Sequence, residues 1–331
     1  MFRIGLNPYG FAHTVGLQGL GTPRANPDGV GLHGFITIAR EVGARCLEFD
    51  GRWLAPLSDG ELARLGEALP PVPRICSYWL RHEPGETLAE AIRATCAIGG
   101  TMVRMHLTPV LEGARGGQGA RWDEMLRHAR ATLNREAPLA ADAGLTIAVE
   151  NHQDLRSDEL LAIAGDAGDN VGLTLDTGNP FAVGEDPMSF VRRAAHRIRH
   201  VHLKDYVSQF TPEGFRLVRC AIGEGCVPFA ELAAALDECS PSLTASIEVG
   251  ALDARHVRVF APDWWQGYPS RDERELQTAL DRLQTNRLDD NADYRTPWEK
   301  REPVDAVVAY ELRQLHKSVQ NLTTLGWMKG E

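Results

Sequence analysis

Eight short apolar runs recur along the chain, and segments with helical patterns separate them. The runs lie at residues 2–7, 45–50, 74–79, 102–107, 146–152, 171–176, 199–204 and 244–249. Strands that alternate with helices pair in parallel through crossover connections. Eight such units in one chain favour a closed (β/α)8 TIM barrel, an α/β fold, over an open doubly wound sheet.

The segments between the runs carry helix boundary signals. Thr87 and Glu90 have the spacing of a capping box, and so do Ser270 and Glu273. Pro187 stands where the first residue of another helix is expected. These signals predict three of the helices that connect the strands.

Two regions depart from a minimal barrel. A long glycine-rich loop, residues 8–31, lacks the spacing of a nucleotide-binding loop, and we interpret it as a lid. Near the C-terminus, apolar residues recur at helical spacing from Val304 to Leu322. We therefore predict a barrel domain at residues 1–285 and a C-terminal extension at residues 286–331, whose long helix packs on the barrel or on a partner subunit.

Composition narrows the classes of function. A net charge of −10 opposes a nucleic-acid surface, because phosphate binding depends on Lys and Arg. No stretch approaches the roughly 20 apolar residues of a membrane span, and the first residues show no secretory signal. The six cysteines include no CxxC pair and are expected to be reduced. We expect a cytoplasmic homo-oligomer that acts on a small molecule, without a nucleic-acid or membrane partner.

Four successive strand ends carry groups that bind hard metal ions. They are Glu150, Asp176, His202 and Glu248, and the first three are spaced at equal intervals of 26 residues. The carboxyl ends of barrel strands line one mouth, where active sites are built. Three carboxylates there would repel one another without a cation. With the imidazole they suit Mn²⁺, our first choice, or Mg²⁺ or Co²⁺. The alternative is that each carboxylate caps a helix or pairs with an arginine.

The motifs around these residues resemble those of the xylose isomerase-like TIM barrels, which include sugar isomerases, tagatose-type 3-epimerases, inosose dehydratases and family-2 apurinic endonucleases. The similar motifs are AVENH, LDTGN, RHVHLKD, GEGCVPF and SIEVG, within about residues 145–250. Glu48 and His106 match more loosely. The resemblance implies that the four strand-end residues bind the metal, and that Glu150 and Glu248 also exchange a proton with the substrate.

The sequence departs from this pattern at one position. The tagatose-type epimerases and the endonucleases have histidine three residues after the strand-six aspartate, and Asn179 stands there in this chain. The change puts the epimerase substrate contact in question and removes one ligand of the endonuclease metal cluster. Together with the acidic charge, it disfavours DNA repair.

Further side chains are expected to reach the same mouth. His152 and Lys204 each lie two positions after a proposed ligand, so strand alternation points them to the same side. For each, a structural role is the alternative, as is packing for Trp264, which follows the eighth run. The expected substrate contacts are His152, Lys204, Asn179, Asn7, His106, Glu48 and Trp264.

The expected chemistry follows from a metal ion with open coordination positions. Such an ion polarises a carbonyl and stabilises an enediolate, while a carboxylate removes and returns the proton. We predict a divalent-metal-dependent isomerase or epimerase of a small keto-sugar or sugar derivative. One alternative is a metal-dependent lyase, a decarboxylase or dehydratase of a polyhydroxy keto acid or inosose in carbohydrate catabolism. Another is a metal-poor sugar-binding subunit.

Overall fold

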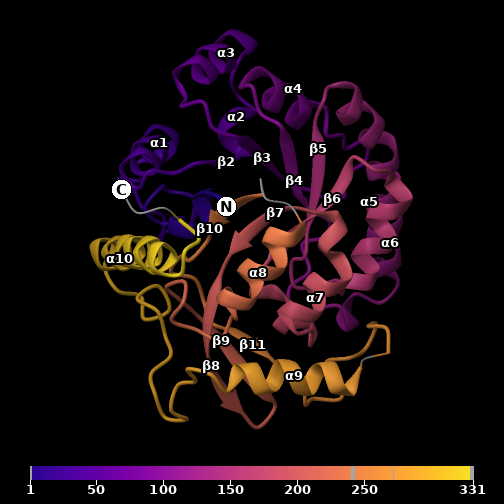
Figure 1. Ribbon diagram of the computed structural model, residues 1–331, viewed down its shortest axis with the longest axis vertical. Helices are drawn as coiled ribbons and strands as arrows, with labels where there is room; N and C mark the ends of the chain where they lie inside the picture. The colour runs from indigo at the N-terminus through magenta and orange to yellow at the C-terminus, as the bar shows by residue number, and fades with distance from the viewer. Residues whose placement is uncertain (1, 240–242, 271, 329–331) are drawn as a thin grey trace.

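Eight parallel strands form a closed barrel. Figure 1 shows where the helices and most of the strands named below lie. The computed structural model describes residues 2–239, 243–270 and 272–328. The barrel strands are β1 Arg3–Leu6, β2 Leu47–Asp50, β3 Arg74–Trp79, β4 Met102–His106, β5 Thr146–Glu150, β6 Val171–Asp176, β7 Ile198–Leu203 and β10 Thr244–Ile247. Their order is β1-β10-β7-β6-β5-β4-β3-β2, and β1 also pairs with β2. The predicted (β/α)8 TIM barrel is confirmed, and each strand lies inside its predicted run except β7, which begins one residue earlier, at Ile198.

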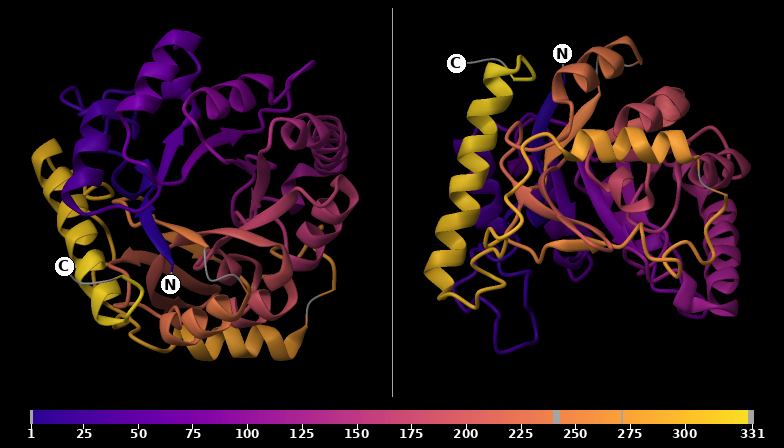
Figure 2. Two further views of the ribbon diagram at one scale, coloured as in Figure 1. Left: turned by 45° about the horizontal axis from the view of Figure 1, so that its top comes forward. Right: turned by 90° about the horizontal axis from the view of Figure 1, so that it is seen from below.

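Helices surround the barrel, as the left view of Figure 2 shows. The α-helices are α1 Gly31–Glu41, α2 Gly51–Leu54, α3 Asp59–Ala68, α4 Ala89–Ala97, α5 Ala120–Asp142, α6 Ser157–Ala167, α7 Pro187–Ala194, α8 Phe229–Cys239, α9 Glu273–Leu283 and α10 Val304–Thr324. Short 3-10 helices are η1 Pro8–Phe11, η2 Gly116–Gln118, η3 Asn179–Val183 and η4 Ala195–Arg197. The buried apolar side chains of helices and strands form one large core.

The helix boundaries agree only in part with the sequence signals. Pro187 is the first residue of α7, as predicted. The capping boxes predicted at Thr87 and Ser270 are wrong, because both helices begin further along the chain. Each box glutamate then lies too early in the first turn to reach back to the cap. Asp272 caps α9 instead, by accepting hydrogen bonds from two backbone N–H groups.

A second sheet, antiparallel, begins directly after β7 and was not predicted. Its strands are β8 Asp205–Thr211, β9 Gly214–Cys220 and β11 Arg255–Val257, in the order β11-β9-β8. A single residue, Lys204, separates β7 from β8, so no turn signal marks the change of sheet. Because β7 ends at the mouth of the barrel, this sheet stands beside the mouth.

The predicted C-terminal helix is confirmed as α10, which runs along one side of the molecule in Figure 2. Its inner face carries one buried carboxylate, Glu311. Oε2 of Glu311 accepts hydrogen bonds from the N–H of Thr14 at 2.8 Å and from its hydroxyl at 2.7 Å. Oε1 accepts from the N–H of His13 at 3.2 Å and of Ala251 at 3.4 Å. α10 thus holds the loop after β1 against the segment after β10.

Two further sequence expectations concern cysteines and membranes. The five cysteines whose side chains are described are free thiols: Cys46, Cys76, Cys220 and Cys226 are buried, and Cys96 is exposed. The side chain of Cys239 lies outside the described structure. Within the described ranges, no helix combines the length and apolar character needed to cross a bilayer.

Candidate metal centre and substrate cavity

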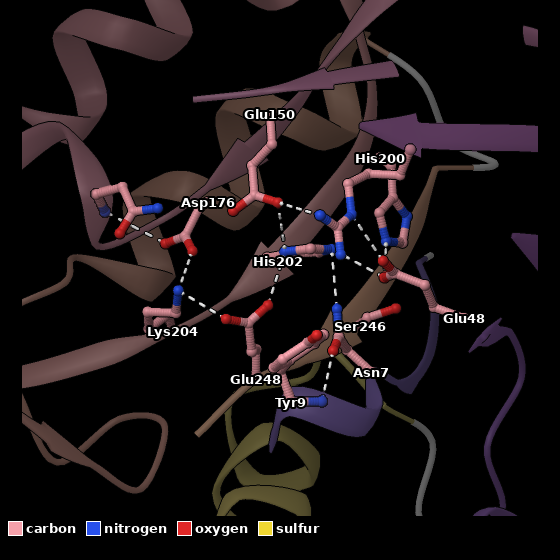
Figure 3. A network of polar contacts seen from close by, with 12 residues as sticks. Asn7, Tyr9, Glu48, Glu150, Asp176, His200, His202, Lys204, Ser246 and Glu248 are labelled. Carbon is pink, nitrogen blue, oxygen red and sulfur yellow. Dashed lines mark hydrogen bonds and ion pairs between the residues drawn. The ribbon is translucent and has the colours of Figure 1, made fainter. Parts of the chain in front are cut away.

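The four predicted ligands meet at the carboxyl end of the barrel, as Figure 3 shows. Glu150 ends β5 and Asp176 ends β6, while His202 on β7 pairs in register with Asp176. Glu248 directly follows β10. Ligand atoms of Glu150, Asp176 and His202 lie within 4.8 Å of one another, and all three residues are buried. Oε2 of Glu248 lies 2.9 Å from Nδ1 of His202.

The imidazole of His202 is oriented from below by Glu48. Nε2 of His202 lies 2.8 Å from Oε2 of Glu48, whose side chain is completely buried. With the proton on Nε2, Nδ1 faces the carboxylates of Glu150, at 3.4 Å, and Glu248. Nδ1 makes no well-aligned hydrogen bond within the described residues, although both carboxylates lie close to it. A histidine held through one nitrogen by a carboxylate, with the other nitrogen open, is typical of metal ligands.

Lys204 bridges two of the carboxylates. Its ammonium group donates hydrogen bonds to Oδ2 of Asp176 and, at 2.8 Å, to Oε1 of Glu248. Asp176 also accepts backbone N–H bonds at the start of η3, so it acts partly as a cap. The ammonium group of Lys204 pairs with one oxygen of Asp176 and one oxygen of Glu248. Oε2 of Glu248, Nδ1 of His202 and the carboxylate of Glu150 are not among its partners. The buried set of three carboxylates and one imidazole nitrogen that faces two of them fits a hard divalent cation.

Neighbouring charges keep both glutamates ionised. Burial raises the pKa of Glu150. The adjacent histidines and Arg104 lower it by more, so the net pKa lies well below its ordinary value. Burial also raises the pKa of Glu248, and Lys204 outweighs that effect. Burial lowers the pKa of His202, yet the surrounding glutamates raise it well above its ordinary value. A proton and a metal cation therefore compete for this imidazole.

Arg104, on β4, lies among these groups and was missed by the sequence interpretation. Its Nε donates to Oε1 of Glu48 at 2.8 Å. Its Nη1 lies 3.1 Å from Oε2 of Glu150 and 2.9 Å from Nε2 of His106. A signal was present, because Arg104 stands two positions before His106 in a buried strand and so shares its side.

A cavity of about 200 Å³ opens beside the four proposed ligands. Its lining residues are Tyr9, Ala12, Gln18, Trp79, Arg104, His106, Glu150, His152, Gln153, Lys204, Arg219, Glu248, Leu252 and Arg255. One wall is aromatic: the rings of Tyr9 and Trp79 stack with centroids 5.5 Å apart. His106 lies 5.1 Å from Trp79 and stacks on His152 at 4.3 Å. Ring faces beside a few placed polar groups are typical of a small-molecule site.

Of the seven expected substrate contacts, the structure brings His106, His152 and Lys204 to the cavity. Asn7 and Glu48 lie beneath the centre instead. Nδ2 of Asn7 is 3.4 Å from Nε2 of His202, and both residues are completely buried.

Asn179 and Trp264 are not among the cavity-lining residues. Asn179 donates to the carbonyl of Asn151 at 3.0 Å and so ties η3 to the end of β5. The indole of Trp264 is buried against Gly113, in the loop between β4 and α5. The tryptophan at the cavity is Trp79, at the end of β3.

The sequence model of the xylose isomerase-like TIM barrel family matches residues 36–256, and the chain belongs to this family. An uncharacterised protein of Escherichia coli (strain K12), YihM, is 33% identical over 92 residues, 28% of each chain. An inosose dehydratase of Clostridium botulinum (strain Alaska E43 / Type E3) is 31% identical over 104 residues, 30% of this chain and 33% of the enzyme. The matches thus span about a third of these relatives or less.

Solved structures show the same fold at lower identity. A D-allulose 3-epimerase from Methylomonas sp. has a TM-score of 0.57 and 17% identity, over 96% of this chain and 98% of the epimerase. The IOLI protein, solved with a bound zinc atom, has a TM-score of 0.52 and 16% identity, over 86% and 96%. At these identities the likeness concerns the fold alone.

Proposed function

We propose that the protein is a divalent-metal-dependent isomerase or epimerase of a small keto-sugar or sugar derivative. The observation that carries this proposal is the pair Glu150 and Glu248, two ionised carboxylates that border one cavity and flank Nδ1 of His202. The residues that would hold the cation are these three and Asp176, with Mn²⁺ as our choice over Mg²⁺ and Co²⁺. A bound cation supplies Lewis-acid chemistry that polarises a substrate carbonyl.

The two glutamates are suited to move a proton. Their lowered pKa values keep both in the proton-accepting form. β6 and β7 separate the strands that carry them, so they approach a substrate from different directions. One carboxylate takes a proton from the carbon beside the carbonyl. Return of a proton to the other face of that carbon gives an epimer, and delivery to the neighbouring carbon gives an isomer.

Unpaired polar atoms in the cavity support a substrate with several hydroxyl groups. Burial lowers the pKa of His152 well below its ordinary value, so the ring is neutral, and its Nδ1 has no partner within the described residues. Oε1 of Gln18 and Oε1 of Gln153 are also buried without a partner there. Buried polar atoms of this kind are normally hydrogen-bonded, and sugar hydroxyls are suitable partners.

A metal-dependent lyase is the second candidate, and the inosose dehydratases among the relatives support it. In a dehydratase, the same proton removal would be followed by loss of a β-hydroxyl, and in a decarboxylase CO2 would leave. Burial lowers the pKa of Lys204, but Asp176 and Glu248 raise it above its ordinary value. Its lasting positive charge would stabilise negative charge that develops on the substrate in either reaction.

Turnover in D2O, followed by mass spectrometry, separates the two candidates. An isomerase or epimerase should place deuterium on the carbon beside the carbonyl, whereas a lyase product is lighter by water or CO2. Glu150→Gln and Glu248→Gln should each slow the exchange by about 100-fold or more, with a smaller effect on substrate binding. Metal content must be measured in both variants, because both residues are proposed ligands. Loss of mass would overturn the isomerase.

We also propose that the protein is a homo-oligomer and that it is located in the cytoplasm. Size-exclusion chromatography with light scattering measures the first, and cell fractionation measures the second. A monomer, or a protein recovered outside the cytoplasm, would contradict the corresponding expectation.

A further inference from the structure

Among the described residues, four basic side chains line the cavity: Arg104, Lys204, Arg219 and Arg255. Arg104 and Lys204 form close hydrogen bonds with carboxylates. Arg219 and Arg255 do not, because the carboxylate oxygens that pair with them lie 3.9 Å and 3.8 Å from their Nη1 atoms. Nη1 of Arg219 donates to the carbonyl of Val249 at 3.2 Å, but neither guanidinium group forms a close pair with a carboxylate, so both can take a further partner.

Both of these guanidinium groups also contain a buried nitrogen without a partner. Nε of Arg219 and Nε of Arg255 make no hydrogen bond within the described structure. The residue Arg219 is only 6% exposed, so bulk water does not easily replace the missing acceptor. A buried donor without an acceptor costs free energy. At the wall of a cavity, such donors indicate a ligand that brings acceptors.

The antiparallel sheet places the two arginines on one face. Arg255 of β11 is the register partner of Leu217 on β9, and Arg219 lies two residues beyond Leu217. Alternate residues of a strand share a face, so Arg219 and Arg255 are diagonal neighbours. Such neighbours are about 7–8 Å apart, within reach of long side chains.

The charge balance leaves these two arginines with a net positive charge, of which the nearby Glu112 offsets one unit at most. A divalent cation together with Lys204 would balance the carboxylates of the proposed ligands, and Glu48 balances Arg104. Glu112 lies near Arg255, at 3.8 Å, and its own Oε2 is buried without a partner within the described residues. The cavity wall made by the sheet is therefore positive and suits an anion.

We propose that Arg219 and Arg255 bind a carboxylate of the substrate, so that the substrate is a polyhydroxy keto acid or a similar sugar acid rather than a neutral keto-sugar. Planar guanidinium groups match the two oxygens of a carboxylate in paired hydrogen bonds. This inference rests on the proposed function for the polyhydroxy part of the substrate. The carboxylate part rests on the two arginines alone.

Binding of matched probes to the metal-loaded protein tests the inference without turnover. D-gluconate and D-glucitol are six-carbon polyols that differ at one end, a carboxylate against a hydroxymethyl group. Calorimetry should show gluconate binding at least about tenfold more tightly than glucitol. D-glucitol 6-phosphate tests phosphate as the other source of negative charge. We expect it to bind more weakly than gluconate.

Arg219→Gln and Arg255→Gln should each weaken gluconate binding about tenfold and leave glucitol binding unchanged. Arg216→Gln is the matched control. Arg216 lies on β9 next to Leu217, so it points to the opposite face of the sheet from Arg219, and its guanidinium stacks on Tyr294. This control should keep the preference for gluconate. Arg255 is the less buried of the pair, so Arg255→Gln decides the test if Arg219→Gln fails to fold.

Three results would overturn the inference: equal or undetectable binding of gluconate and glucitol, a preference for the phosphate probe, or a preference for gluconate that survives in both variants. The last result would mean that gluconate merely chelates the metal. Deuterium exchange by a protein without the gluconate preference would refute this inference and leave the proposed function intact. A preference without any exchange would refute the proposed proton transfer instead.

Discussion

The part that each polar side chain plays at the mouth depends on whether it already has a partner. Both oxygens of Glu48 are hydrogen-bonded, one to Arg104 and one to His202, so Glu48 acts by positioning these groups. His152 keeps an unpaired Nδ1 at the cavity and is available to a ligand. The same distinction separates Lys204, paired with two carboxylates, from the open arginines of the antiparallel sheet.

A second histidine site, away from the cavity, predicts a response to acid. His82 has a positive φ of 63° and joins the loop after β3 to α5 and β4. Its Nε2 lies 2.8 Å from the carbonyl oxygen of Leu107, and its Nδ1 lies 3.1 Å from Nδ1 of His128. With Nε2 as the donor, a neutral His82 accepts a hydrogen bond at Nδ1 from the Nδ1–H of His128. Burial lowers the pKa of His82. The hydrogen bond to the Leu107 carbonyl opposes this shift, and the neighbouring His128 adds to it, so the pKa stays below its ordinary value.

A histidine with a lowered pKa stabilises the fold fully above its ordinary pKa of about 6.5, and this contribution is lost as the pH falls below that value. Asparagine tolerates a positive φ, so His82→Asn is a suitable replacement. This variant should reduce the fall in Tm between about pH 7 and pH 5. His33→Asn, at an exposed position of α1, is the control and should keep the wild-type slope. Equal slopes in wild type and His82→Asn would refute this role.

At the scale of elements, α10 fastens two segments that border the mouth, through the hydrogen bonds of Glu311 to Thr14, His13 and Ala251. The first part of the glycine-rich loop, interpreted from sequence as a lid, is largely buried and anchored here. We propose that residues 1–285 form the barrel domain and residues 286–331 an extension that clamps this loop.

Glu311→Ala should lower the free energy of unfolding by about 3 kcal/mol, because it leaves several buried backbone donors without an acceptor. Gln320→Ala, on the exposed side of the same helix, should change it by less than about 0.5 kcal/mol. Chemical denaturation measures both. If the two variants are equally stable, Glu311 does not fasten the loop.

Elements with a strong local pattern could be predicted from the sequence. The eight barrel strands and α10 each carry their own apolar periodicity. The sheet of β8, β9 and β11 was not predicted, because β8 follows β7 after a single residue and β11, three residues long, pairs with a strand distant in sequence. The capping boxes failed because similar local signals, one or two residues apart, compete for the start of a helix.

For the whole molecule, the barrel explains why part of the site was predictable. Parallel strands bring their carboxyl ends together, so residues about one βα repeat apart in sequence become neighbours. This rule predicted the meeting of Glu150, Asp176, His202 and Glu248. The walls of the cavity, among them Tyr9, Gln18, Arg219 and Arg255, come from loops and the second sheet, whose positions depend on tertiary packing.

We propose that the mouth of the barrel holds a divalent cation on Glu150, Asp176, His202 and Glu248. Elemental analysis of protein purified without chelator tests it most directly, with Asp176→Asn as the variant and Asp158→Asn, exposed on α6, as the control. We expect a single divalent ion per chain in wild type and control, and less than about a tenth of that in Asp176→Asn, with an unchanged circular dichroism spectrum. Wild-type protein without metal, even after incubation with Mn²⁺, Mg²⁺ or Co²⁺, or a wild-type metal content in Asp176→Asn, would contradict the claim.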